Sequence, residues 1–388
     1  MFDCNAPVFA PLLLPSDEDA LATCGPLQAA ILSATTAVSD RLGSFRRIAR
    51  QRAAKLIVDP RTAVFQFEGY MSMEDMRALP YSPGRTTLGT LWQPSRFSRS
   101  RRREVVQAVA ALQIHLEADA VVAPYFLIPD PRHDWLEVAV DVARETRLQA
   151  GGRPVAANVC VDIDTILAEH ARAAYGDAFG ESNADLFLLT VVNLDEREAS
   201  PDEVRAVLDL LARLSQTAPS MLLYAGRLGL SAIAAGAVGY AGGTLELEAH
   251  PRRYLREGFV NLRANAHYLP GAMVRLPVRL AAAVAECVPA TDVAGAAPAT
   301  RLVRRERARR ALDAKAAEAH WLGSYVESER EAALAGRFEE AISLCREARA
   351  ALGESDGERL ARSDFHYLEV LGEIAGGDKA ELLGDASL

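Results

Sequence analysis

The sequence has few cysteines, and no two of them form a closely spaced pair. The five are Cys4, Cys24, Cys160, Cys287 and Cys345. Zinc ribbons and fingers use CxxC-type pairs, and disulfide-stapled secreted domains use a dense and usually even set of cysteines. The spacing therefore argues against both classes. It predicts reduced thiols in a cytoplasmic protein, with Cys160 buried in a strand.

The sequence also lacks a long apolar run and a surplus of basic residues. A helix that spans a bilayer needs about 18 or more apolar residues in succession. The nearest approach, residues 228–243, is short and interrupted by glycines. The first residues lack the basic stretch that precedes the apolar core of a signal peptide. Acidic residues outnumber basic ones by 52 to 43, for a net charge of −9, so we expect no membrane contact and no overall nucleic-acid-binding character.

Aromatic residues make up only 6% of the chain, although 50% of the chain is hydrophobic. Small and branched side chains must therefore fill the core, as they do in parallel sheets covered by helices. Apolar runs that alternate with helical patterns predict strands at residues 10–14, 55–58, 120–128, 154–161, 186–192, 221–225 and 237–241. An eighth strand is expected near 62–67 or 266–269. Residues 27–50 have the pattern of one amphipathic helix.

This alternation predicts an α/β fold, a (β/α)8 TIM-like barrel that occupies residues 1–288. The alternative is an open doubly wound sheet, whose usual GxGxxG motif would follow the first strand. That motif is missing, and Asp59-Pro60-Arg61-Thr62 stands after an early strand instead. The clearest helix start is Ser200, an N-cap residue followed by proline and two acidic residues.

The C-terminal part of the chain has a different composition. Residues 289–300 are rich in Ala, Pro, Gly and Thr, which is typical of a linker. Residues 301–388 are expected to form a helical appendage. Within it, residues 336–342 (GRFEEAI) are typical of the turn and second-helix start of a tetratricopeptide-type hairpin, although a single unit is no array. We expect this appendage to bind a protein partner.

In a barrel the functional site lies at the carboxyl ends of the strands. Polar residues stand at these ends in several of the predicted units: Asp59, Glu68, Tyr125, Asn158, Asp162, Asn193, Asp195, Arg227, Thr244, Glu246, His267 and Tyr268. Among them, Asp59, Glu246 and His267 are the candidates for acid–base or nucleophilic work. The alternatives are that Asp59 starts a turn and that His267 is satisfied locally.

Residues 220–248 carry the clearest strand–helix–strand unit. Arg227 after its first strand, with Gly242, Gly243 and Thr244 after its second, could hold a phosphate together. The alternative is that the glycines only permit a tight turn. The remaining candidates for substrate binding are Glu68, Tyr125, Asn158, Asn193 and Asp195, and the last two could instead cap a loop. Carboxylates and histidines do not converge in the sequence as a metal site requires, so we expect no metal or other cofactor.

Two basic runs could contact the phosphates of a nucleic acid. Residues 96–103 lie beside Trp92 and Phe97, and their candidate contacts are Arg99, Arg101, Arg102 and Arg103. Aromatic rings next to arginines suit a single-stranded polyanion. The alternative is that this run, like residues 301–310, is a solvated helix start.

The segment VDPRTAVFQF contributes Asp59, Phe65, Gln66 and Phe67. It resembles the early-strand DSGGFQ segment of tRNA-guanine transglycosylases and their DNA-modifying relatives. The resemblance implies a (β/α)8 barrel that exchanges a nucleobase at a ribosyl carbon, with Asp59 assisting the exchange. Arg61 and Thr62 stand where that family has glycines. The zinc-binding cysteines of the family are absent, and Glu246 is the nearest acid to its second catalytic aspartate.

We therefore expect a barrel enzyme that acts on a phosphate-, ribosyl- or nucleobase-containing small molecule, with transferase chemistry such as base exchange, or lyase chemistry. The alternative is a catalytically inactive barrel that serves as a binding or scaffold subunit of a protein or nucleic-acid complex.

Overall fold

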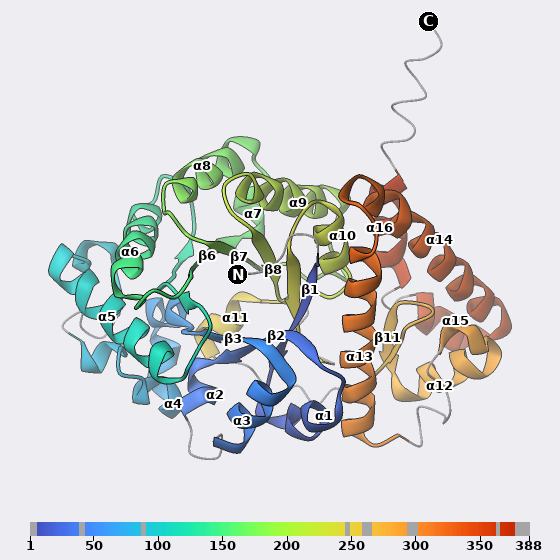
Figure 1. The fold of residues 1–388 in the computed structure, drawn as a ribbon. Coiled ribbons are helices and arrows are strands. Elements are labelled where there is room, and N and C mark those ends of the chain that lie inside the picture. The colour runs from blue at the N-terminus through green and yellow to red at the C-terminus, as the bar shows by residue number, and fades with distance from the viewer. Residues whose placement is uncertain are drawn as a thin grey trace, which may run out of the picture.

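A nearly closed barrel of parallel strands organises the chain in the computed structural model (Figure 1). The structure describes residues 6–38, 43–86, 91–244, 249–257, 266–292, 302–361 and 365–376. The barrel strands are β1 (Val8–Leu13), β2 (Leu27–Ser33), β3 (Ala53–Asp59), β4 (Val121–Val122), β5 (Leu127–Ile128), β6 (Val155–Asp162), β7 (Leu186–Val192), β8 (Ser220–Leu223) and β9 (Gly239–Gly242). Because β4 and β5 both pair with β6, they count as one interrupted strand of the barrel. With these two taken together, the barrel has eight strand positions, which we call staves.

Every strand pair in the barrel wall is parallel, which confirms the predicted TIM-like architecture. Strands β9 and β1 pair, and a single parallel bridge between Ile57 and Ala120 joins β3 to β4. The strands are apolar on both faces because one face fills the barrel and the other packs under helices.

The prediction of the eighth strand was wrong. The eighth strand is β2, from a segment assigned to a helix, and two helices follow it, α2 (Ala34–Val38) and α3 (Gly43–Arg52). Residues 27–33 are almost continuously buried, so their apolar pattern has no periodicity that separates a strand from a buried helix. Of the two expected candidates, residues 62–66 form a 3-10 helix, η3 (Thr62–Gln66), and residues 266–269 form β10 (Ala266–Leu269). Strand β10 pairs antiparallel with β11 (Val274–Pro277), outside the barrel wall.

Side chains of η3 replace part of the backbone ladder at the β4–β5 stave. The Thr62 hydroxyl accepts a hydrogen bond from the Tyr125 N–H and donates to the Tyr125 carbonyl, both at 2.7 Å. The Gln66 amide accepts from the Leu127 N–H at 2.7 Å and donates to the Leu127 carbonyl at 3.0 Å. These bonds satisfy the backbone where the stave is interrupted, and they hold η3 at the carboxyl end of the barrel.

Helices surround the barrel (Figure 1). The segments between its strands contain η1 (Pro15–Asp17), α1 (Glu18–Thr23), α2 (Ala34–Val38), α3, η3, η4 (Glu68–Ser72), α4 (Glu74–Ala78), η5 (Pro83–Arg85), η6 (Pro94–Arg96), α5 (Arg99–His115), α6 (Trp135–Gln149), α7 (Ile163–Ile166), α8 (Glu169–Gly180), α9 (Pro201–Ser215) and α10 (Leu228–Ala234). The predicted start of α9 is confirmed: Ser200 and Glu203 form a reciprocal capping box, and a proline is at the first helical position.

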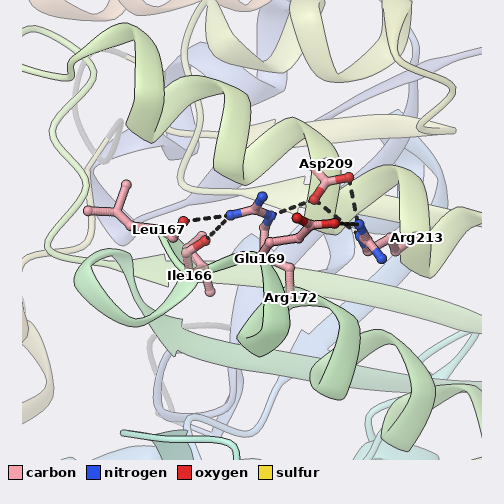
Figure 2. A network of polar contacts seen from close by, with 6 residues as sticks. All are labelled: Ile166, Leu167, Glu169, Arg172, Asp209 and Arg213. Carbon is pink, nitrogen blue, oxygen red and sulfur yellow. Dashed lines mark hydrogen bonds and ion pairs between the residues drawn. The ribbon is translucent and has the colours of Figure 1, made fainter.

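Polar contacts tie neighbouring helices together on the outside of the barrel (Figure 2). Arg172 of α8 donates to the carbonyls of Ile166 and Leu167 at 2.7 and 2.8 Å and pairs with Asp209 of α9. Arg213 pairs with the same carboxylate at 3.1 Å. Although partial burial raises the pKa of Asp209, these two arginines lower it more, and hold it below its ordinary value. The network therefore stabilises the contact between α7, α8 and α9 at neutral pH.

The C-terminal elements are α11 (Arg252–Glu257), β10, β11, α12 (Val278–Cys287), η7 (Pro289–Thr291), α13 (Arg304–Gly323), α14 (Glu327–Ala351), α15 (Glu354–Ala361) and α16 (Phe365–Gly376). Helix α13 contacts β1, α1 and α10, so it covers the barrel where β9 meets β1 (Figure 1). The division into a barrel, a linker and an appendage from residue 301 stays a prediction, although α13 packs as part of the barrel's helical layer. Residues 336–342 lie inside α14, so the expected tetratricopeptide-type turn does not occur there.

Candidate functional site

A buried polar cluster lies at the carboxyl ends of the barrel strands. We call it the Asp59 cluster, and its members are Asp59, Arg61, Tyr81, Tyr125, Tyr224 and His250. All six are at most 7% exposed. Asp59 ends β3, Tyr125 follows β4, and Tyr224 follows β8, so the parallel topology brings them to one end of the barrel. The segment before α5 contributes Tyr81, and the segment before α11 contributes His250.

Asp59 is the only carboxylate of this cluster. Its Oδ1 accepts hydrogen bonds from the Tyr125 hydroxyl and from the Arg61 N–H, both at 2.9 Å. The second bond belongs to an Asp-Pro turn in which Arg61 adopts a left-handed backbone conformation, with φ of 52°. The alternative that Asp59 starts a turn is therefore confirmed. The same carboxylate also accepts the Tyr125 bond of the buried cluster.

Burial decides the electrostatics of Asp59. Removal from water raises the pKa of its carboxyl above the ordinary value, against the opposing effects of the Arg61 N–H, the Arg61 guanidinium and the Tyr125 hydroxyl. Burial and the nearby Asp59 also raise the pKa of Tyr81 and of Tyr125 well above the ordinary value. Both phenols therefore remain protonated hydrogen-bond donors.

His250 and Tyr224 form the aromatic side of the cluster. Their rings meet edge to face, with centroids 4.3 Å apart. Burial and the nearby Arg61 together lower the pKa of His250 to about 3, so the ring is neutral at physiological pH. Sequence reasoning missed Tyr81, Tyr224 and His250 as site residues. Tyr224 lay inside a predicted strand, and the other two lie in irregular segments whose path only the folded chain sets.

A second group of polar residues lies on the β6–β7 side of the mouth. Asp162, half-buried at the end of β6, accepts a 2.7 Å hydrogen bond from the side-chain amide of Asn193, which follows β7. Asn193 accepts in turn from the Arg252 N–H at 2.9 Å. Burial raises the pKa of Asp162, and Arg252 opposes that shift. Asn158 is buried further down the same strand. The structure thus brings together Asp59 with Tyr125, and Asp162 with Asn193.

The residues expected to bind phosphate form hydrogen bonds with other parts of the protein. The N–H groups of Gly226 and Arg227 donate to the carboxylate of Glu196, the latter at 3.1 Å, so Glu196 occupies the anion position before α10. The Arg227 guanidinium donates to the Met273 carbonyl at 2.9 Å. Lys315 of α13 donates to the Gly243 carbonyl at 2.9 Å.

Gly242 has a steric role. A Cβ atom there would lie 2.0 Å from the Ala225 carbonyl oxygen, so close backbone approach requires glycine. Thr244 is buried at the end of the same segment.

The remaining predicted residues lie apart from the Asp59 cluster. Glu68 is exposed on η4. Asp195 is bonded to Arg197, through Nε at 2.9 Å. His267 is buried in the β10–β11 hairpin, which packs against α12 and α13, and its Nε2 lies 3.4 Å from Asp292 Oδ2. Glu246 lies outside the described residues.

The basic run begins α5, and its aromatic neighbours are not available to a nucleic acid. Trp92 and Phe97 are at most 4% exposed and belong to an aromatic core with Phe126 and Trp135. Arg102 pairs with Asp141 of α6 at 2.6 Å, whereas Arg99 and Arg103 are exposed. Arg101 donates weakly, at 3.5 Å, to the Arg96 carbonyl. Buried rings cannot stack on bases, so the part of the nucleic-acid hypothesis that used Trp92 and Phe97 was wrong.

Within the ranges that the structure describes, no three His, Cys, Asp or Glu side chains gather as a metal ion would require. No described helix is both long and apolar enough to cross a membrane. No protein-family model matches the sequence, and no curated protein matches it.

Proposed function

We propose that the chain is an enzyme whose active site is the carboxyl-terminal mouth of the barrel, with Asp59 as its acid–base or nucleophilic group. The observation that carries the proposal is the position of Asp59. It is a 5% exposed carboxylate at the end of β3, held by the Tyr125 hydroxyl and beside Arg61. A carboxyl with a raised pKa can carry a proton closer to neutral pH than an ordinary aspartic acid can, which suits acid–base catalysis.

The proposed ligand contains a nucleobase or a ribosyl group, and the proposed reaction is base exchange. The segment that resembles the transglycosylases supplies Asp59 itself, and the Tyr125 hydroxyl beside it is a hydrogen-bond donor. In such a reaction the bond between the base nitrogen and the ribosyl carbon breaks, and its electron pair stays with the nitrogen. The protonated Asp59 carboxyl would give its proton to that nitrogen. The incoming base would bond to the same ribosyl carbon through its own ring nitrogen, and the proton of that nitrogen would return to the Asp59 carboxylate. We do not place a phosphate of the ligand at Arg227, because Glu196 already binds the N–H groups there.

The test compares two aspartate variants of the full chain. Purified wild type, Asp59→Asn and Asp195→Asn are each incubated with a nucleoside and the isotopically labelled free base, and label in the nucleoside is measured by mass spectrometry. Asp195 is the matched control because it also follows a barrel strand but is bonded locally to Arg197. We expect exchange by wild type and by Asp195→Asn, and at least a hundredfold loss in Asp59→Asn. Equal rates in the two variants would refute the role of Asp59.

A specific observation favours the scaffold function as a second candidate. The mouth is filled by the protein's own side chains: Arg61 is 7% exposed and its guanidinium donates to the Tyr254 carbonyl at 3.4 Å. A barrel closed in this way could serve as a structural unit that presents α14–α16 to a protein partner. Deletion from residue 301 is a poor test because it would remove α13 from the helical layer that covers the barrel. Charge reversal at the exposed Glu347 and Arg349 of α14 is the better perturbation. A partner that co-purifies with wild type and is lost from this variant would support the scaffold.

A further inference from the structure

Two neighbouring barrel strands each bury a polar side-chain atom that has no hydrogen-bond partner among the described residues. Asn158 on β6 is 3% exposed, and Thr190 on β7 is 1% exposed. Within the described chain, neither Asn158 Oδ1 nor Thr190 Oγ1 has a partner. A buried polar atom without a partner destabilises the fold, so natural proteins contain few of them and each one calls for an explanation.

Strand geometry places both groups inside the barrel. Side chains alternate along a strand, so Asn158, Cys160 and Asp162 share one face of β6. The β6–β7 register pairs Cys160 with Thr190, which puts Thr190 on the same face. The ring of Phe187 on β7 contacts the ring of Phe179 on α8, with centroids 6.4 Å apart, so Phe187 faces the helical layer. Thr190 lies three residues further along β7 and therefore faces the barrel interior.

Asp162 links this interior face to the solvent-facing rim. It is half-buried at the end of β6, and Asn193 holds its Oδ2 at 2.7 Å. Asn193 has a left-handed backbone conformation, with φ of 65°, and its other side-chain atom accepts from the Arg252 N–H. These contacts fix the carboxylate of Asp162 above Cys160. One strand therefore presents a buried amide and a rim carboxylate on the same side.

We infer that Asn158, Thr190 and Asp162 form a ligand-binding subsite on the β6–β7 side of the barrel mouth. The subsite binds hydrogen-bond donors of the molecule on which Asp59 acts, so the inference rests on the proposed function. Asn158 Oδ1 and the Asp162 carboxylate are acceptors, and the Thr190 hydroxyl can accept or donate. Asn158 and Asp162 are four residues, about 13 Å, apart along β6, so the matching ligand carries N–H or O–H groups at two places, one at the rim and one deeper in the barrel. A phosphate would be repelled by Asp162.

If Asn158 and Thr190 had a purely structural role, apolar replacements would lower the stability of the free protein. Asp162 also caps α7, through a 3.3 Å bond from the Asp164 N–H, so it has a structural duty that Asn158 Oδ1 and Thr190 Oγ1 do not share. If those two atoms serve a ligand, apolar side chains of similar size should stabilise the free protein while they weaken binding. Functional residues commonly reduce stability in this way.

The first arm of the test measures melting temperature without ligand. Thr190→Val and Asn158→Leu are compared with Thr146→Val, a control on α6 in which the buried hydroxyl donates to the Val142 carbonyl at 2.6 Å. We expect the first two variants to melt at or above the wild-type temperature and the control to melt below it. A clear fall in melting temperature for both Thr190→Val and Asn158→Leu would overturn the inference.

The second arm measures binding by calorimetry to adenosine, guanosine, cytidine, uridine and ribose 5-phosphate. For a probe that binds wild type, we expect at least tenfold weaker binding by Thr190→Val, Asn158→Leu and Asp162→Asn. If Asp59→Asn abolishes exchange while these three variants bind as wild type does, the subsite is refuted and the proposed function stands. If no probe binds wild type, the nucleoside proposal fails, and the melting temperatures alone decide the subsite.

Discussion

Replacement of Glu318 by Gln should remove a pH-dependent component from the stability of the protein. Glu318 lies on α13 and lines a cavity of about 10 Å³, room for a single water molecule, together with Arg227, Tyr240, Tyr268, Arg275 and Lys315. The Tyr268 hydroxyl lies 2.8 and 3.0 Å from its two carboxylate oxygens. Burial raises the pKa of Glu318 from 4.5 to about 7, although Tyr268, Lys315 and two arginines favour the ionised form.

The sign of the effect follows from this raised pKa. Between about pH 4.5 and pH 7 the folded protein holds a proton that the unfolded chain has released, so the free energy of unfolding falls as the pH rises. The contribution of Glu318 is fully present below about pH 4.5 and is lost as the pH rises through about 7. Each unit of pKa shift corresponds to about 1.4 kcal/mol. Glu318 is partly exposed, so screening by water reduces the total to about 1–3 kcal/mol.

Urea denaturation at pH values from 4.5 to 8.5 measures this contribution. Glu318→Gln cannot ionise, so its stability relative to wild type should rise by about 1–3 kcal/mol between pH 5 and pH 8. Exposed Glu347→Gln on α14 is the control for loss of one negative charge. Tyr268→Phe, which removes a donor to the ionised form, should move the transition to higher pH. A constant difference between Glu318→Gln and wild type at every pH would refute the reasoning.

Two further predictions concern the backbone and the helical layer. Gly242→Ala should lower the free energy of unfolding by about 3 kcal/mol or more, since its Cβ would lie 2.0 Å from a carbonyl oxygen. Exposed Gly84→Ala, with no atom within 4 Å of its Cβ, should have little effect in the same urea titration, and similar losses in both would contradict the steric argument. Asp209→Asn should cost about 1 kcal/mol or less at pH 7, because this carboxylate has a lowered pKa and is partly exposed. That cost should shrink as the pH falls below about 3.8 and through the lowered pKa of the folded protein, because the wild-type carboxyl then becomes protonated. A cost that does not change as the pH falls would rule out the ionic explanation.

Local pattern determined much of the fold. Seven apolar runs alternate with helical stretches, and that alternation was sufficient to predict a parallel barrel because parallel strands are buried on both faces. The start of α9 was also readable, since a capping box is a local interaction between Ser200 and Glu203. Asp59 was found because it follows an apolar run, and in a barrel the residues after such runs meet at one end.

The remaining elements depended on contacts between distant residues. Strand β2 could not be separated from a buried helix, because its pairing with β1 and β3 is what makes it a strand. Residues 62–66 have a strand-like composition, yet Thr62 and Gln66 bond to Tyr125 and Leu127, so they form a 3-10 helix.

The chemistry of the mouth was also a tertiary property. The sequence by itself determined that polar residues follow the barrel strands. Only the tertiary structure decided which of these residues face each other and which of them are buried away from water. Tyr224 comes close to Asp59, and His250 packs against Tyr224, from segments far away in the chain. Burial raises the pKa of the Asp59 carboxyl. The same burial leaves Asn158 Oδ1 and Thr190 Oγ1 without partners among the residues that the structure describes. Desolvation depends on everything packed around a group, and that surrounding is assembled only when the barrel closes.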